Sequence, residues 1–434
     1  MSTSTTHLTR RRLAAVASTA VAAALLAGAG PAAAQAHSSA RSPGGTRAVL
    51  GSTWGTAKEV PGTATLNHGG SAYISSVSCA SLGNCSAGGG YTDGSGHSQA
   101  FVVSQVSGTW GTAKEVPGTA TLNQGGGAAV SSLSCASAGN CSAGGSYTDG
   151  SGNAQAFVVS QVHGTWGTAK EVPGTAKLNT GDNDWIYSVS CASAGNCSAG
   201  GNYATTSEEH PLVVSQTGGT WGKAKGIPIG TGPGAQVSSV SCASAGNCSA
   251  GGAYEDAPGS AQAFVIGQIH GTWGTAKVIP GPGSSTFAVI NSVSCSSAGN
   301  CSAAGTYRDS SGHFQALVVS QAGGSWGTAK EVPGTAALNQ GGNATINSLS
   351  CASAGNCSAG GTYKDSSGHT QAFVVNQTRR IWRKAEELPG TATLNKGGNA
   401  TINWLSCAPA GNCSAGGYYK DSSGHFQAFI VSQT

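Results

Sequence analysis

The sequence predicts an all-β fold of seven similar four-stranded sheets, and three observations support this prediction. A unit of roughly 56 residues recurs along the chain, and a period of this size is typical of solenoids and propellers. Cysteines recur in pairs six positions apart, and each unit carries one tryptophan within a W-G-T-A-K-E-V-P-G-like segment. The chain opens on this tryptophan segment and stops just before the next one, which is the offset that a closed ring requires. We therefore expect a seven-bladed β-propeller.

Each unit offers four segments with the composition of antiparallel β-strands, named A to D here. In the second unit we expect strand A near Ala128–Cys135, strand B near Cys141–Tyr147 and strand C near Gln155–Gln161. Strand D is expected at Thr109–Val116 and again at Thr165–Val172. Apolar and polar side chains alternate along these runs, and this period of two is typical of strands. No window has a helical period, so we expect no helix.

Turn residues separate the strands. Asp149-Gly150-Ser151-Gly152 has the composition of a hairpin turn between strands B and C, and a short glycine turn follows strand C. A proline ends each strand D, because proline cannot donate to a sheet ladder. These prolines are Pro61, Pro117, Pro173, Pro228, Pro280, Pro333 and Pro389.

The expected topology places the loops on two opposite faces. The D–A crossings and B–C turns share one face, and the A–B loops and C–D turns share the other. Because the D–A crossings are the longer loops, we expect their face to bind partners. Strand D of the last blade must come from Ala48–Val60 at the N-terminus, which closes the ring and removes the open sheet edge. Residues 48–434 would then form a single domain.

Seven local cysteine pairs predict one disulfide per blade. Each pair encloses five residues and would fasten one A–B hairpin. The alternative is a metal site built from two pairs, but the usual zinc spacings are shorter. The expected bridges are Cys79–Cys85, Cys135–Cys141, Cys191–Cys197, Cys242–Cys248, Cys295–Cys301, Cys351–Cys357 and Cys407–Cys413.

The N-terminus has the composition of an export signal. Arg10-Arg11-Arg12 precedes an Ala/Leu-rich stretch, and small residues allow cleavage after Ala34 or Ala36. The same arginines resemble a twin-arginine signal. We expect residues 1–36 to be a signal peptide, residues 37–47 a flexible lead, and the mature protein to be secreted.

Charge argues against two classes of partner. The chain has 21 basic and 17 acidic residues, and three of the arginines lie in the signal. The mature chain would be nearly neutral, so we expect neither nucleic acid nor a membrane as its partner. We also expect a monomer.

Repeated charges are expected to be architectural. Lys stands four residues after six of the seven repeat tryptophans, and Glu stands five residues after five of them. We interpret both as surface charges of strand D, since a catalytic residue need not recur five times. Asp-x-Ser-Gly-His turns, such as Asp93 to His97, could bind a cation, but one Asp and one His per turn give few ligands. We interpret these aspartates as acceptors for backbone N–H groups of the turn.

Residues that depart from the repeat are the better candidates for function. We expect a partner surface among them, because aromatic and arginine clusters are common in protein interfaces. For Asp182, Asp184 and Trp185, a calcium or sugar site is an alternative. The predicted surface comprises Asp182, Asp184, Trp185, Glu208, Glu209, Arg379, Arg380, Arg383 and Trp404.

No enzymatic constellation is recognised. Some propellers are sialidases with an arginine cluster, but three of the six arginines beyond the signal lie within one five-residue span. The Asp-box of those enzymes and the H-E-x-x-H motif are absent, and no G-x-S-x-G elbow is recognised, since the one match to that spacing, Gly323–Gly327, is part of the tryptophan repeat. We expect no catalytic residues, no cofactor and no metal.

The repeat S-V-S-C-A-S-A-G-N-C-S-A-G-G, followed by W-G-T-A-K-E-V-P-G, resembles a family of secreted actinobacterial propellers, the dispase autolysis-inducing proteins. The resemblance covers the chain from about Thr46 to Thr434 and implies a non-enzymatic protein. It implies two partners: neutral metalloproteases of the dispase and thermolysin type, whose self-digestion is promoted, and transglutaminase, for which the protein is a glutamine donor. It supplies no motif of binding residues.

Glutamines can be ranked by their expected surroundings, because a transglutaminase needs an exposed, mobile backbone. Gln124, Gln340 and Gln236 lie in Gly-rich crossings and are our candidates. Other blades carry His68 or Lys396 at the position of the first two, so the fold does not require Gln there. An alternative function is a multivalent lectin-like propeller that binds cell-wall carbohydrate through equivalent pockets.

Overall fold

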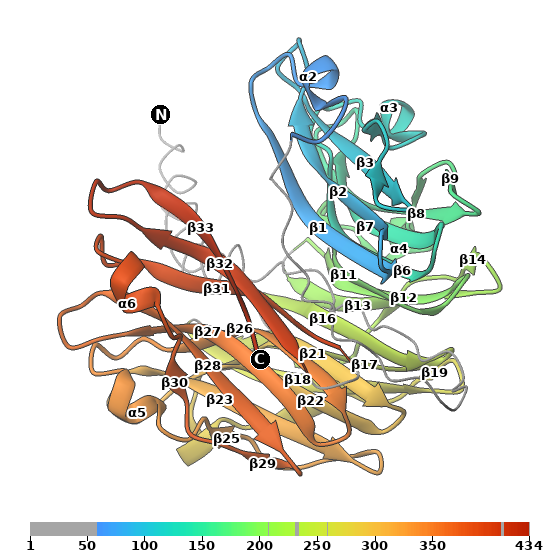
Figure 1. Ribbon diagram of the computed structural model, residues 1–434. Helices are drawn as coiled ribbons and strands as arrows, with labels where there is room; N and C mark the ends of the chain where they lie inside the picture. Colours follow the sequence, from blue (N-terminus) through green and yellow to red (C-terminus); the bar gives the residue numbers. More distant parts are fainter. Residues whose placement is uncertain (1–58, 207, 231–233, 258, 409–411, 434) are drawn as a thin grey trace, which may run out of the picture.

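A computed structural model describes residues 59–206, 208–230, 234–257, 259–408 and 412–433. Its strands form seven successive antiparallel sheets, the blades of a seven-bladed β-propeller, which confirms the predicted fold class. Figure 1 shows the blades following one another around the molecule in chain order. The predicted signal peptide, the lead and most of the closing strand at Ala48–Val60 lie outside the described residues.

Each of the first six blades is built from strands A, B and C in hairpin order, with strand D along the outer edge of strand C, and the described part of the last blade comprises strands A, B and C. The strands of the first three blades are β1 (Ala72–Ser81), β2 (Asn84–Thr92), β3 (Ser98–Val106), β4 (Thr109–Trp110) and β5 (Lys114–Glu115); β6 (Ala129–Ser137), β7 (Asn140–Thr148), β8 (Ala154–Val162), β9 (Thr165–Trp166) and β10 (Lys170–Glu171); and β11 (Asp184–Ser193), β12 (Asn196–Ala204), β13 (Glu209–Thr217), β14 (Thr220–Trp221) and β15 (Lys225–Gly226).

The remaining blades repeat this order. They contain β16 (Ala235–Ser244), β17 (Asn247–Ala257), β18 (Ser260–Ile269), β19 (Thr272–Trp273) and β20 (Lys277–Ile279); β21 (Ala288–Ser297), β22 (Asn300–Arg308), β23 (Phe314–Ala322), β24 (Ser325–Trp326) and β25 (Lys330–Glu331); β26 (Thr345–Ser353), β27 (Asn356–Lys364), β28 (Thr370–Thr378), β29 (Ile381–Trp382) and β30 (Glu386–Glu387); and β31 (Ala400–Cys407), β32 (Cys413–Lys420) and β33 (Phe426–Ser432).

Strand D differs from its prediction, because it is broken into two short strands. In the first blade, β4 and β5 both pair with β3, and the residues between them leave the ladder. Gly111 N donates to Ser104 O at 2.9 Å in this break. In the second blade, the tryptophan before this break contacts the preceding blade, since Trp166 Nε1 donates to Ser104 Oγ at 3.4 Å.

Short helices occupy five of the crossings between blades, although no helix was predicted. They are α2 (Thr63–Leu66), α3 (Thr119–Leu122), α4 (Thr175–Leu178), α5 (Thr335–Leu338) and α6 (Thr391–Leu394), and a 3₁₀ turn spans Pro282–Ser284. Four residues make little more than one turn, which is too short to show a hydrophobic period in the sequence. Each α-turn starts after a glycine of positive φ, such as Gly118 at 88°. None of the described helices has the length and apolar character needed to cross a membrane.

The core lies between the blades rather than within them. One cluster joins Val102 of the first blade to Val130, Leu133 and Phe157 of the second, with Trp166 packed against it. Glycines on strand B make this close packing possible, since a Cβ on Gly144 would lie 2.7 Å from Ile186 of the next blade. Full burial of a side chain such as Phe157 stabilises the fold by roughly 1.5–3 kcal/mol.

Pairs of serines fasten the innermost strand of one blade to that of the next. Ser76 Oγ accepts a hydrogen bond from Leu133 N at 2.9 Å, and Ser78 Oγ accepts one from Cys135 N at 2.9 Å. We call such a pair a serine clamp, and it recurs at the later seams, for example between Ser132 and Val189 N. Each clamp satisfies strand N–H groups that would otherwise be buried without a partner.

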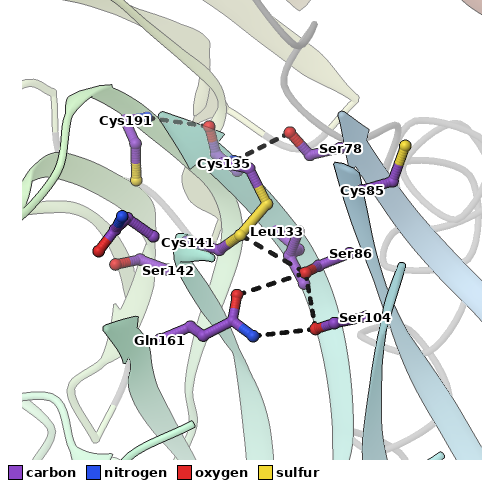
Figure 2. Close-up of a disulfide and its surroundings, with 12 residues drawn as sticks. Ser78, Cys85, Ser86, Ser104, Leu133, Cys135, Cys141, Ser142, Gln161 and Cys191 are labelled. Atoms are coloured by element: carbon purple, nitrogen blue, oxygen red, sulfur yellow. Dashed lines mark hydrogen bonds between the residues drawn. A yellow bond between two sulfur atoms is a disulfide. The ribbon is translucent and has the colours of Figure 1, made fainter. Parts of the chain in front are cut away.

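All seven predicted disulfides are present, and each joins facing residues of one A–B hairpin. Figure 2 shows Cys135–Cys141 between the clamp at Ser78 and a polar group made by Ser86, Ser104 and Gln161. Gln161 Nε2 of the second blade donates to Ser104 Oγ of the first at 2.9 Å. The disulfides are therefore local to a blade, and hydrogen bonds run from blade to blade beside them.

Candidate functional surfaces

The loops form two distinct faces, as the sequence predicts. Gly108 N donates to Gly83 O at 2.8 Å, which joins a C–D turn to the A–B loop of the same blade, and the other blades up to the sixth repeat this bond. We call this side the Cys-loop face. On the opposite side, Gly125 N donates to Thr148 O at 2.9 Å and joins a D–A crossing to a B–C turn. We call this side the crossing face.

The repeated aspartates of the crossing face organise their own turns. Asp93 Oδ1 accepts hydrogen bonds from Ser95 N and His97 N, both at 2.9 Å, and Oδ2 accepts one from Gln99 Nε2 at 2.9 Å. These bonds, led by that from Gln99, hold the pKa of Asp93 below its ordinary value. The same arrangement recurs at Asp149, Asp309, Asp365 and Asp421. The interpretation as turn residues is confirmed, and no cluster of three or more His, Cys, Asp or Glu side chains suited to a metal ion occurs among the described residues.

The repeated glutamates of strand D are not simple surface charges. Tyr307 Oη donates to Glu331 Oε2 at 2.7 Å, and equivalent contacts join Tyr91 to Glu115 and Tyr363 to Glu387. Burial and the adjacent carboxylate raise the pKa of Tyr91 to about 12. These glutamates therefore tie strand B to strand D within a blade, which the surface-charge interpretation missed.

Blade 3 gathers aromatic side chains near the crossing face. The rings of Trp185 and Tyr187 stack with centroids 6.2 Å apart, and Trp185 Nε1 donates to Asn183 Oδ1 at 2.6 Å. The ring of His210 stacks on Tyr203 at 5.1 Å, and its Nε2 lies 3.6 Å from Glu208 Oε2. Tyr203 recurs in every blade, whereas Tyr187 stands where the other blades have serine or asparagine and His210 where they have glutamine. Both stacking contacts are therefore specific to blade 3.

Two carboxylates lie beside this cluster in partly buried surroundings. Asn202 Nδ2 donates to Glu209 Oε2 at 3.2 Å, and burial raises the pKa of Glu209 despite that bond. Burial, and then the charge of Glu209, raise the pKa of Glu255 in the next blade. The carboxylates make the seam between blades 3 and 4 locally acidic.

Asp184 does not belong to the partner surface where it was predicted. Its side chain is fully buried at the start of β11, at the position where every other blade has alanine. Asp184 Oδ1 accepts a hydrogen bond from Ala156 N at 2.7 Å, while Oδ2 has no partner. Burial raises the pKa of Asp184 to about 7. Its neighbour Asp182 is exposed, with a φ of 62°.

The other members of the predicted partner surface are far from blade 3 in the topology. Arg379 and Arg380 form the C–D turn of blade 6, on the Cys-loop face, and Arg383 is exposed just after β29. Trp404 lies on β31 of the last blade and is 43% exposed. The nine residues therefore do not form one continuous surface.

Two of the three candidate glutamines are exposed, and one is not. Gln124 and Gln340 follow α3 and α5, and their amides donate to carbonyls of those turns, for example Gln124 Nε2 to Ala120 O at 3.1 Å. Gln236 lies in β16 rather than in a crossing, and its buried Nε2 donates to Ser238 Oγ at 3.1 Å. The sequence misplaced it because strand β16 begins earlier than the glycine run suggested.

Exposed aliphatic side chains of the Cys-loop face were missed by the sequence analysis. They are Leu82, Val106, Val162, Ile269 and Ile381. The sequence contained one indication of these residues, because Leu82 stands where the other six units have alanine. Aliphatic residues in a strand-rich repeat suggest the core, and only the structure shows that these five point outward.

Comparisons with known proteins give structural likeness only. No family model matches the chain, and no curated protein matches it. A subtype N11 neuraminidase-like protein from a flat-faced bat isolate is 12% identical, with a TM-score of 0.37, over 68% of this chain and 83% of that one. The protein Sqt1 of Chaetomium thermophilum is 12% identical, with a TM-score of 0.47, over 79% of each chain. An ulvan lyase of polysaccharide lyase family 25 is 10% identical, with a TM-score of 0.40, over 68% of this chain and 81% of that one. At these values the likenesses identify neither a family nor an activity.

Proposed function

We propose that this protein is a secreted, non-enzymatic binding propeller that recognises neutral metalloproteases of the thermolysin type and promotes their autolysis. The observation that carries the proposal is the repeat itself, whose cysteine-paired and W-G-T-A-K-E-V-P-G segments resemble those of dispase autolysis-inducing proteins. Seven disulfides are typical of proteins in an oxidising, extracellular compartment, which agrees with secretion. Exposed glutamines agree with a second role as a transglutaminase substrate.

The effect on a protease would follow from selective binding. A protease that opens locally exposes a cleavable segment, and a ligand shifts that equilibrium only if it binds the opened form more tightly. A tenfold preference shifts the equilibrium by about 1.4 kcal/mol, which raises the population of a rare opened form about tenfold. A scaffold fastened by local disulfides and serine clamps suits this role, because it need not reorganise when it binds.

The test is to incubate the purified mature protein with a thermolysin-type protease and follow residual activity and fragments with time. We expect protease activity to fall and protease fragments to accumulate while the propeller stays intact. A serine protease of unrelated fold, treated in the same way, is the control and should keep its activity. An unchanged metalloprotease contradicts the proposal, and saturable binding of cell-wall sugars at several sites would then support the lectin-like alternative.

A further inference from the structure

Large apolar side chains project from the Cys-loop face into solvent. Leu82 lies at the tip of an A–B loop and is 101% exposed. Val106, Val162 and Ile269 each open a C–D turn, and Ile381 closes one; all four are at least 55% exposed. Outside the first and last blades' strands, only Val278 and Leu394 are comparable among the described residues, and both are less exposed. Exposed apolar groups therefore concentrate on this face.

The repeat shows that the fold does not require these side chains. Where Val106, Val162 and Ile269 open their turns, the equivalent residues of blades 3, 5 and 6 are Thr217, Ala322 and Thr378. The position of Ile381 is threonine or serine in the other blades, and that of Leu82 is alanine. Since equivalent turns form without them, the five aliphatic residues are not explained by folding.

The C–D turn of blade 6 departs from the repeat, because it has a residue other than glycine at a position where the backbone conformation favours glycine. Arg380 has a φ of 68°, in the left-handed region that favours glycine, whereas the positive φ of Arg379, 50°, recurs at Ser107, His163 and His270 in the turns of other blades. The first five blades all have glycine at the position of Arg380. Arg380 Nη2 also donates to Asn300 Oδ1 of the neighbouring blade at 3.1 Å, so its guanidinium extends along the face. A non-glycine residue kept in a strained turn is a sign of function.

Charge separates the two faces. No A–B loop or C–D turn contains an aspartate or glutamate, so Arg379 and Arg380 have no acidic neighbour in these loops. The crossing face carries the turn aspartates and Glu208, interspersed with basic residues such as Lys177, Arg308 and Lys396. A partner with an acidic surface would be attracted to the Cys-loop face, where the arginines are the only charged groups of these loops apart from histidine.

We propose that the Cys-loop face is the docking surface for the metalloprotease, and that it recognises an apolar patch bordered by carboxylates on that protein. The proposal rests on the proposed function and deepens it. It places the binding surface on the Cys-loop face, whereas the length of the D–A crossings had predicted the crossing face. The aliphatic residues would supply the contact area, and the arginines would orient the partner and pair with its carboxylates.

The repeat supplies variants that test this surface without disturbing the fold. The apolar variant is L82A/V106T/V162T/I269T/I381T, in which each residue is replaced by one that other blades use at that position. The arginine variant is R379S/R380G, which restores the turn of the first blade. The matched control is Val278→Glu, which also replaces an exposed aliphatic residue by the residue of other blades, but on an outer strand. Thermal unfolding checks that all variants fold.

The readout is the dissociation constant for a thermolysin-type protease whose zinc is removed by phenanthroline while its calcium is kept. We expect the apolar variant to bind at least tenfold more weakly, and the arginine variant to bind more weakly with a smaller dependence on salt. The control should bind as the wild type does. Wild-type affinity in both face variants would overturn the assignment of the face alone. Absence of binding by the wild type would overturn the proposed function as well.

Discussion

Asp184 shows what one exception to the repeat does to its surroundings. The other blades place alanine at this buried position, whereas the carboxyl group of Asp184 has one oxygen bonded to Ala156 N and the other without a partner. Glu171 of β10 and Tyr147 of β7 are the titratable groups that interact with it from the preceding blade. Burial in these surroundings makes the charged form unfavourable.

The first prediction is a pH dependence of stability that depends on Asp184. Its pKa is about 7 in the folded protein and near the ordinary 3.8 in the unfolded chain. The folded state therefore holds an extra proton between these values, and the free energy of unfolding falls as pH rises from about 4 to about 7. Such a shift corresponds to at most about 4 kcal/mol. Urea unfolding of wild type and Asp184→Ala at pH 5 and pH 8 measures it.

The alanine variant should be more stable than the wild type at pH 8 and should lose most of this pH-dependent difference. Asp184→Asn is the second variant, because its amide oxygen keeps the acceptor for Ala156 N but does not ionise. A wild-type pH profile in both variants would show that Asp184 stays ionised or unburied in solution.

At the scale of single residues, the sequence showed which positions depart from the repeat, but it did not show whether their side chains are exposed or buried. Asp182 and Asp184 are two positions apart and both depart from the repeat, yet one is exposed and the other is buried. The direction of a side chain at the start of a strand depends on where the ladder begins. A period of two cannot place that start to a single residue.

At the scale of single elements, the repeat predicted strands more reliably than it predicted how they join. The alternating serines of strand A were interpreted as ordinary strand periodicity, but their hydroxyls accept N–H groups of the next blade. These N–H groups lie on another blade, so the structure is needed to identify them as the partners of the serine hydroxyls. Helical turns such as α3 were missed for a different reason, since four residues carry no period.

A second prediction concerns the helical turns and transglutaminase. Gln124 and Gln340 are exposed at the ends of single turns, which open at little cost because a short helix has few internal hydrogen bonds. Gln236 is buried within β16. Labelling with an amine donor and transglutaminase should modify the first two and spare Gln236, as read by peptide mass spectrometry. Gln124→His, the residue of the first blade at that position, should remove one site; preferential labelling of Gln236 would contradict the ranking.

At the scale of the whole molecule, the first and last blades show unused contact surfaces. Figure 1 places β1 and β31–β33 at the two ends of the array of blades. Ile74 of β1 is exposed, although its equivalent Ile186 is buried against Gly144. A Cβ on Gly416 of the last blade would have no neighbour closer than 3.8 Å. By the pattern of the other seams, closure of the ring would bring Ile74 against Gly416.

A cavity of about 340 Å³ lies beside the last blade, and the residues around it correspond to those that surround tryptophan side chains in earlier seams. Asn376, Gln377 and Gln433 line it. In the earlier seam, Trp166 Nε1 donates to Ser104 Oγ at 3.4 Å, and Asn376 is the residue equivalent to Ser104 in the sixth blade. Trp221 and Trp273 make the same contact, with Ser160 and Ser215. By this order of blades, the tryptophan expected beside Asn376 is Trp54, which precedes the described residues.

The third prediction is that the segment around Trp54 closes the ring. Removal of residues 37–58 should lower the thermal midpoint strongly, whereas removal of residues 37–47 alone should have little effect. Trp54→Ala should cost roughly 3–5 kcal/mol, as expected for loss of a buried aromatic side chain. Equal midpoints for the two truncations would mean that the seam closes without this segment.

The position of the disulfides has a consequence for how the molecule tolerates proteolysis. Each bridge closes five residues within one hairpin, so the main chain is the only covalent link from blade to blade. A single nick in one D–A crossing would leave two fragments that no bridge holds together. The resistance of the molecule to proteolysis would then depend on how strongly hydrogen bonds fix each D–A crossing. Asn123 holds one of them, through bonds to Ser98 O at 3.0 Å and from Gly127 N at 2.7 Å.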